Sequence, residues 1–185
     1  MKAILMSIRP QYVAKILNGE KTIEVRKKFP KDYVGWVYIY CTKDNHNYLI
    51  DYRNAGGKFC ITPTDDLSLL KEGITQKLNG KVVARFWCDK VEEIENKPFV
   101  RYGYPRTKTL DSYNLTKYSC VDNCDIKEYL AGGNGYAIHI TKLEIFDKPK
   151  EIYEMKRLEH FGIKNKCKML VPITRAPQSW QFIEV

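Results

Sequence analysis

The order of predicted elements in residues 1–27 constrains the fold more than any other feature of the chain. Residues 3–8 form a short apolar run, which predicts a buried strand. Pro10 then opens a helix, since proline is tolerated in the first helical turn, and Gly19 follows where a left-handed cap is expected. Residues 21–27 alternate between polar and apolar side chains, which predicts a second strand. The chain thus begins with a strand, a short helix and a strand.

Short strands dominate the rest of the chain. Aromatic and β-branched residues predict them over residues 34–41, 81–88, 136–140 and 179–185. Two polar stretches, residues 42–79 and 96–135, lie between these strands. Many short strands, an early helix and no repeating strand–helix–strand order favour the α+β class, as a small curled sheet or barrel with helices on its rim.

A second helix is predicted within the polar stretch 96–135. It begins at an Asp122 cap and ends near Gly132. Three residues spaced as on one helical face form its apolar side: Ile126, Tyr129 and Leu130.

The net charge of +9 is concentrated at the two ends of the sequence. Residues 1–43 carry nine basic and three acidic side chains, a net charge of +6. Residues 44–140 carry thirteen of each and are neutral, whereas residues 141–185 carry nine basic and six acidic, a net charge of +3. If the two ends meet in space they form one positive face, which would attract phosphates. A basic surface that only maintains solubility is the alternative.

Composition points to an intracellular protein without a membrane partner. No segment approaches the roughly 20 apolar residues of a membrane-spanning helix, and Arg9 interrupts the first apolar run too early for a signal peptide. We therefore expect a cytoplasmic protein whose six cysteines are free thiols. Cys120 and Cys124 have a spacing seen at zinc sites, but no second close pair accompanies them. We expect neither a metal site nor a cofactor.

Residues 18–26, with the sequence NGEKTIEVR, resemble the G-x-K-x-x-E-x-R signature of ASCH domains, a family of the PUA-like superfamily. Residues 6–12 are similar to the lead-in of that family, and residues 175–180 to the closing segment of its phage and bacterial members. The resemblance implies one ASCH domain over residues 1–185, folded as a PUA-like small mixed β-barrel with rim helices. Relative to short members, residues 42–79 and 96–135 look like insertions.

The motif supplies three charged side chains suited to a nucleotide. Glu24 and Arg26 lie two apart on the predicted strand and so share a face, and Lys21 lies at the turn before it. Arginine offers a planar donor fork for phosphates or base edges, and glutamate accepts from amines and ribose hydroxyls. The alternative is a strand-surface salt bridge, worth about 0–1 kcal/mol. The resemblance implies that these residues line the ligand cleft.

The predicted site extends beyond the motif. We expect Lys21, Glu24 and Arg26 to line a cleft beside the helix over residues 10–18, with Arg9 near its rim. Four further candidates for ligand or RNA contacts complete the set: Arg9, Lys27, Ser179 and Trp180. Trp180 has two open roles, closing the cleft or packing in the core. His139 lies between two isoleucines on a predicted strand and is interpreted as structural.

This set favours binding of RNA or a nucleotide-like ligand, and the resemblance to ASCH domains implies a regulatory role in translation or transcription. The resemblance also implies enzymes, a hydrolase that deacetylates N4-acetylcytidine or a ribonuclease, with Lys21 and Glu24 as catalytic residues. In the deacetylating branch a threonine nucleophile stands where this chain has Glu24, and a carboxylate cannot form and release the acyl ester. Glu24 could activate a water while Lys21 stabilises the oxyanion. The assisting glutamate stays open among Glu92, Glu93 and Glu128.

A third class of function also stays open. The two predicted insertions provide surface of unassigned purpose, which is compatible with a phage-type protein that binds a host protein.

Overall fold

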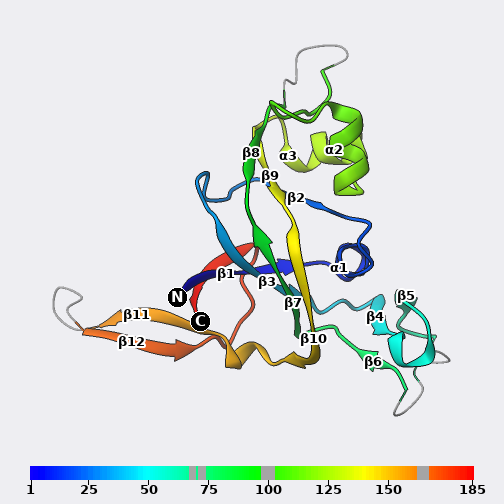
Figure 1. Ribbon diagram of the computed structural model, residues 1–185, viewed down its shortest axis with the longest axis vertical. Helices are drawn as coiled ribbons and strands as arrows, with labels where there is room; N and C mark the ends of the chain where they lie inside the picture. The colour runs from blue at the N-terminus through cyan, green and yellow to red at the C-terminus, as the bar shows by residue number, and fades with distance from the viewer. Residues whose placement is uncertain (67–69, 71–73, 97–102, 162–166) are drawn as a thin grey trace. The chain divides into compact units, whose positions relative to one another are not determined.

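The computed structural model describes residues 1–66, 70, 74–96, 103–161 and 167–185 (Figure 1). The chain divides into two compact units, each assembled from segments far apart in the sequence. Unit 1 consists of Met1–Leu17, Trp36–Phe86 and Leu143–Val185, and unit 2 of Asn18–Gly35 and Trp87–Lys142. Within these residues, no helix is both long enough and apolar enough to cross a membrane. The single domain with two insertions stays a prediction.

A seven-stranded sheet organises unit 1 around β1 (Lys2–Ile8). β1 pairs in parallel with β3 (Gly35–Cys41) and antiparallel with β13 (Trp180–Glu184). All of β1 after Lys2 is buried, which explains its apolar sequence. The full strand order is β10 (Thr141–Lys150), β7 (Val82–Cys88), β3, β1, β13, β11 (Lys156–Phe161) and β12 (Cys167–Pro172).

The sheet confirms the α+β class but not the closed barrel. β10 and β12 are its edge strands, and over the part of the chain that the structure describes no strand pairing joins them. The long hairpin of β11 and β12 extends the sheet beyond β13 instead of closing it (Figure 1). β10, β11 and β12 were not predicted from the sequence.

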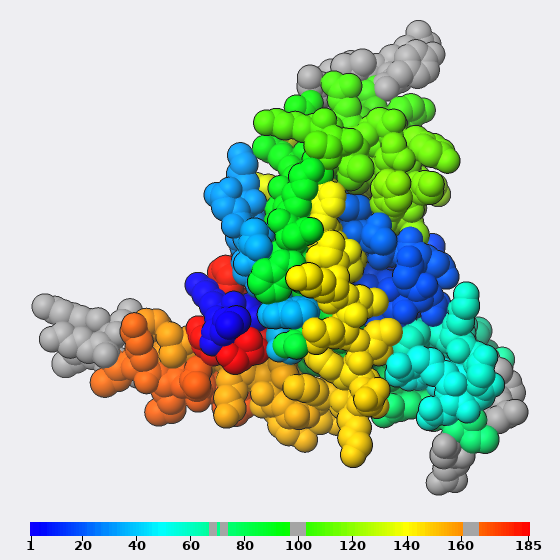
Figure 2. Space-filling view, in the orientation of Figure 1, coloured from blue at the N-terminus to red at the C-terminus, as the bar shows by residue number. Residues whose placement is uncertain are grey.

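The helix α1 (Pro10–Leu17) follows β1 as predicted and packs against a second sheet of unit 1. This three-stranded sheet has the order β5 (Phe59–Pro63), β4 (Asn47–Asp51) and β6 (Gln76–Lys77). The blue atoms of α1 lie against the cyan atoms of β4 and β5 in Figure 2. The three strands within residues 42–79 were not predicted, because β4 has only two buried apolar residues, Leu49 and Ile50, and their signal is short.

The two ends of the sequence meet in unit 1. Besides the pairing of β1 with β13, the amino group of Met1 donates a hydrogen bond to the carbonyl of Val185 (2.6 Å), and dark blue and red atoms adjoin in Figure 2. However, five of the nine basic residues of the first segment belong to unit 2: Lys21, Arg26, Lys27, Lys28 and Lys31. One positive face formed by both ends therefore stays a prediction.

Unit 2 is a three-stranded antiparallel sheet covered by two helices. The strand order is β2 (Ile23–Arg26), β9 (Gly135–His139) and β8 (Val91–Ile94), and the helices are α2 (Ser112–Ser119) and α3 (Asn123–Leu130). Seven buried residues from these elements form the core: Ile23, Val25, Ile94, Leu115, Ile126, Leu130 and Ala137.

The helices of unit 2 were predicted in part. α3 starts after Asp122 as expected, but Tyr129 is 42% exposed and does not belong to the apolar face. α2 was missed because Leu115 is its only buried apolar residue, too little for a periodic pattern. Its first turn is instead stabilised by Asp111, whose side chain accepts a hydrogen bond from the amide of Asn114 (2.8 Å).

Candidate functional site

The signature segment folds as β2 and the turn before it. Ile23 and Val25 point into the core of unit 2, so Glu24 and Arg26 point to the opposite side of the strand. The start of β2 is held by Thr22, whose amide donates to the carbonyl of Tyr118 (2.9 Å). The strand parity expected from the sequence is therefore present.

Lys21, Glu24 and Arg26, hereafter the motif cluster, converge on one another. Lys21 Nζ lies 3.2 Å from Glu24 Oε2, and Arg26 Nη2 lies 2.9 Å from Glu24 Oε1. Lys21 Nζ also donates to the carbonyl of Ser119 in the last turn of α2 (2.6 Å). The three residues are only 2%, 6% and 8% exposed. The motif cluster is thus a buried charge cluster and not the surface salt bridge considered above.

The motif cluster carries more positive than negative charge. One carboxylate is shared between two cations, so the cluster carries a net charge of +1. The carbonyl of Ser119 belongs to the negative end of the α2 dipole, which stabilises the ammonium group of Lys21. That the motif cluster lines a ligand cleft stays a prediction.

The other predicted site residues fall into two groups. Lys27 follows the motif cluster in unit 2, is exposed, and has its ammonium 5.2 Å from the ring centroid of Tyr129. Arg9, Ser179 and Trp180 lie in unit 1. The two groups belong to different units, and the cleft that would join them stays a prediction.

Within unit 1, the end of β1 adjoins the segment that carries Ser179 and Trp180. The amide of Ser7 donates to the carbonyl of Ser179 (2.9 Å), two residues before the exposed Arg9. Trp180 is half-buried and forms an edge-to-face contact with Phe182, with the ring centroids 5.5 Å apart. This contact gives Trp180 a packing role, and a second role at a cleft stays a prediction.

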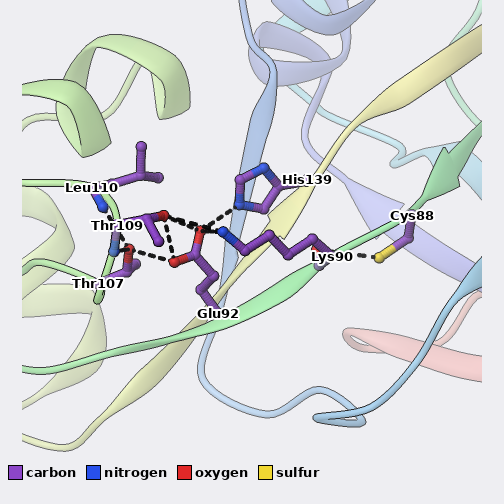
Figure 3. A network of polar contacts seen from close by, with 7 residues as sticks. All are labelled: Cys88, Lys90, Glu92, Thr107, Thr109, Leu110 and His139. Carbon is purple, nitrogen blue, oxygen red and sulfur yellow. Dashed lines mark hydrogen bonds and ion pairs between the residues drawn. The ribbon is translucent and has the colours of Figure 1, made fainter.

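A buried carboxylate network was missed by the sequence analysis. Glu92 on β8 lies 2.7 Å from His139 Nε2 on β9 and 3.0 Å from the ammonium of Lys90. The hydroxyls of Thr107 and Thr109 also donate to Glu92, at 3.0 Å and 2.7 Å (Figure 3). These five residues, hereafter the Glu92 network, join two strands to the loop that precedes α2.

The hydrogen bonds of the Glu92 network determine the protonation state of Glu92. Burial alone would raise the pKa of Glu92, but hydrogen bonds from Thr109, Lys90, His139 and Thr107 outweigh it and lower the pKa to about 2. Glu92 is therefore ionised at neutral pH, and His139 Nε2 must carry the proton that faces it. The network supports the structural interpretation of His139, because its ring is held between two strands.

Glu92 should make the stability of the protein depend on pH in acid. Its pKa is about 2 in the folded state against an ordinary value of 4.5, so the stabilisation is complete above about pH 4.5 and is lost as the pH falls toward 2. After allowance for solvent screening at the half-exposed Lys90, we expect the ionised Glu92 to contribute about 1–3 kcal/mol to the free energy of unfolding. Urea unfolding of Glu92→Gln and wild type at neutral and acid pH measures the difference.

The control for this prediction is Glu93→Gln, which changes the exposed neighbouring carboxylate. The gap between wild type and Glu92→Gln should narrow as the pH falls, while Glu93→Gln follows wild type. A gap that is the same at pH 7 and pH 3 would contradict the role assigned to the carboxylate charge.

Two of the six cysteines, Cys41 and Cys88, are buried and poorly suited to act as nucleophiles. All six are free thiols, and burial raises the pKa of both Cys41 and Cys88 to about 12, so these two stay protonated. Cys120 is half-buried and Cys124 is exposed. Over the described ranges, no group of three or more His, Cys, Asp or Glu side chains is arranged to hold a metal ion.

Comparison with solved structures assigns the fold. The crystal structure of an ASCH protein from Zymomonas mobilis matches with a TM-score of 0.52 and 14% identity, over 98% of this chain and 87% of that chain. A point variant of the same protein matches with a TM-score of 0.54 and 12% identity, over 100% and 91% of the two chains. No family model and no curated protein sequence matches. The chain therefore has an ASCH-type fold, as residues 18–26 predicted.

Proposed function

We propose that this ASCH-type protein binds RNA or a nucleotide-like ligand in the cytoplasm, with a regulatory role in translation or transcription. The observation that carries the proposal is the motif cluster, in which Glu24 aligns Lys21 and Arg26 on one side of β2. A guanidinium held by a carboxylate keeps its planar donor fork in a fixed orientation, which suits recognition of phosphates and base edges.

Charge near the motif cluster supports an anionic ligand. Its net positive charge is followed directly by Lys27 and Lys28, both of which are exposed. Basic side chains that flank a recognition site raise the rate of encounter with nucleic acid and contribute most of the affinity that does not depend on sequence. Lys27 would thus contact the backbone of a strand, while the motif cluster positions the ligand.

The geometry of Glu24 supports binding over hydrolysis. Both of its carboxylate oxygens already contact a cation, Lys21 at 3.2 Å and Arg26 at 2.9 Å. As a general base, Glu24 would take up a proton and lose its charge, which would leave the buried cations Lys21 and Arg26 without their carboxylate. This argues against Glu24 as the general base of an N4-acetylcytidine hydrolase or a ribonuclease.

The test is the salt dependence of RNA binding. A labelled single-stranded RNA is titrated at salt concentrations from about 50 to 200 mM, a range over which phosphate contacts dominate the change in affinity. We expect Arg9→Ala and Lys27→Ala each to reduce the slope of log K against log salt by about 0.7, the value for one contact to a single strand.

Two exposed lysines outside the predicted site provide matched controls, Lys148→Ala in unit 1 and Lys108→Ala in unit 2. Both controls should keep the slope of wild type. The proposal fails if wild type does not bind RNA at the lowest salt concentration, or if Lys27→Ala and Lys108→Ala have the same slope.

A further inference from the structure

A pocket of about 580 Å³ lies in unit 1, within a part of the molecule that the predicted site does not include. Tyr40 at the end of β3, the turn at Gly80 and the segment before η2 (Ile152–Glu154) contribute to its lining. Residues 174–176 close another side. All of the lining residues belong to unit 1, so the pocket is defined within one compact unit.

The charges that line this pocket, hereafter the basic pocket, are mostly positive. Lys43, Lys81 and Arg175 supply three cations, against one carboxylate from Glu151. Lys81 forms an ion pair with Glu151. Lys43 and Arg175 are exposed, and neither side chain has a hydrogen-bond or ion-pair partner among the residues that the structure describes. Two cationic side chains are therefore available to a ligand.

The neutral groups of the basic pocket also favour an acceptor-rich ligand. Burial raises the pKa of Tyr40, so its hydroxyl keeps its proton and can donate. The hydroxyl of Thr174 is a further donor at the pocket surface. A ligand with several acceptor oxygens and negative charge, such as a phosphate group, matches this lining.

The turn that carries one wall of the basic pocket is held in place. The side chain of Asn79 accepts a hydrogen bond from the amide of Leu49 (2.7 Å) and donates one to the carbonyl of Asn47 (3.0 Å). Gly80 has φ of +80°, and a Cβ at that position would stand 3.4 Å from Cε of Lys43. The wall is thus a fixed feature, against which the stem of Lys43 packs.

A second pocket adjoins the first. Its volume is about 550 Å³, and it shares Lys43 and Asn79 with the basic pocket. Tyr48 lines it and has the ammonium of Lys77 3.3 Å from its ring centroid. A phosphate in the basic pocket would therefore have space beside it for the remainder of a nucleotide.

We propose that the basic pocket binds a phosphate group between Lys43, Lys81 and Arg175, carried either by a free nucleotide or by a nucleic acid strand. Glu151 competes with that phosphate for Lys81. The proposal does not require the motif cluster, because none of the three cations lies in unit 2.

The experiment is calorimetric titration with adenosine 5′-monophosphate, with adenosine as the ligand that lacks the phosphate. Arg175→Ala and Lys43→Ala should each weaken binding of the monophosphate about 10-fold, the loss expected for one hydrogen-bonded charge contact. Glu151→Gln should strengthen it several-fold, because Lys81 is released. Lys58→Ala removes an exposed lysine of unit 1 that lines neither pocket and should leave the affinity unchanged.

Competition with a short single-stranded oligonucleotide distinguishes the two sources of phosphate. Displacement of the monophosphate by the strand identifies a strand-binding pocket, and no displacement identifies a nucleotide site. The proposal is overturned if adenosine binds as well as its monophosphate, or if Arg175→Ala binds as well as Lys58→Ala. Lys27→Ala should not affect monophosphate binding, so failure of the proposed RNA site leaves this result interpretable.

Discussion

Glu24→Ala is expected to lower the free energy of unfolding by about 3–5 kcal/mol, because it leaves two buried cations without their carboxylate. Lys21 and Arg26 are 2% and 8% exposed, so water can compensate only a small part of the lost charge. Lys21→Met should cost less, since Glu24 and Arg26 remain as a balanced pair 2.9 Å apart. Urea unfolding followed by tryptophan fluorescence measures both variants.

Glu24→Gln provides the matched comparison, because it removes the charge and keeps a side chain of similar size. The free energy of unfolding of Glu24→Gln should lie between those of wild type and Glu24→Ala. If Glu24→Ala lowers the free energy of unfolding by less than about 1 kcal/mol, the motif cluster behaves like an exposed surface salt bridge. That result would contradict the stabilising role assigned to its buried charges.

Leu115→Ala is expected to cost about 2–5 kcal/mol of unfolding free energy. Leu115 is fully buried and is the residue through which α2 is anchored to the core of unit 2. The same helix presents the carbonyl of Ser119 to Lys21, so loss of the anchor should also weaken the motif cluster. Urea unfolding of Leu115→Ala and wild type measures the difference in the free energy of unfolding.

Tyr113→Ala serves as the control for Leu115→Ala, on the same helix. Tyr113 is 70% exposed, and its truncation should change the stability by no more than about 0.5 kcal/mol. Equal losses in the two variants would show that α2 is not held through Leu115.

Local signals account for the parts of the fold and site that could be predicted. Pro10 and Gly19 mark the limits of α1, and alternation over residues 21–27 places Glu24 and Arg26 on the same side of β2. The convergence of these two side chains needs no long-range information, because residues two apart on a strand always share a face.

The Glu92 network could not be predicted, because it depends on strand register. Glu92 and His139 are 47 residues apart in the sequence. They meet because β8 pairs with β9 so that Glu92 lies opposite Ala137, and because the amide of His139 bonds to the carbonyl of Lys90 (3.0 Å). A lone histidine on a strand gives no sign of that pairing in the sequence.

The weak elements were missed for a different reason. β4 has only a two-residue apolar signal, and α2 has one buried apolar residue, so tertiary packing rather than local pattern determines both elements. The strand pattern left a curled sheet and a barrel open, and the family resemblance favoured the barrel, whereas the large sheet has two edge strands in the described ranges.

The position of β1 between β3 and β13 has a consequence for biosynthesis. β1 is an early segment of the chain, and one of its edges can pair once β3 has been translated. Its other edge stays unpaired until residues 180–184 have left the ribosome, because β13 supplies that partner. Between the synthesis of β3 and that of β13, an apolar strand therefore exposes open hydrogen-bonding groups, which is a condition for aggregation and for binding by chaperones. The nascent chain is most vulnerable before β13 emerges.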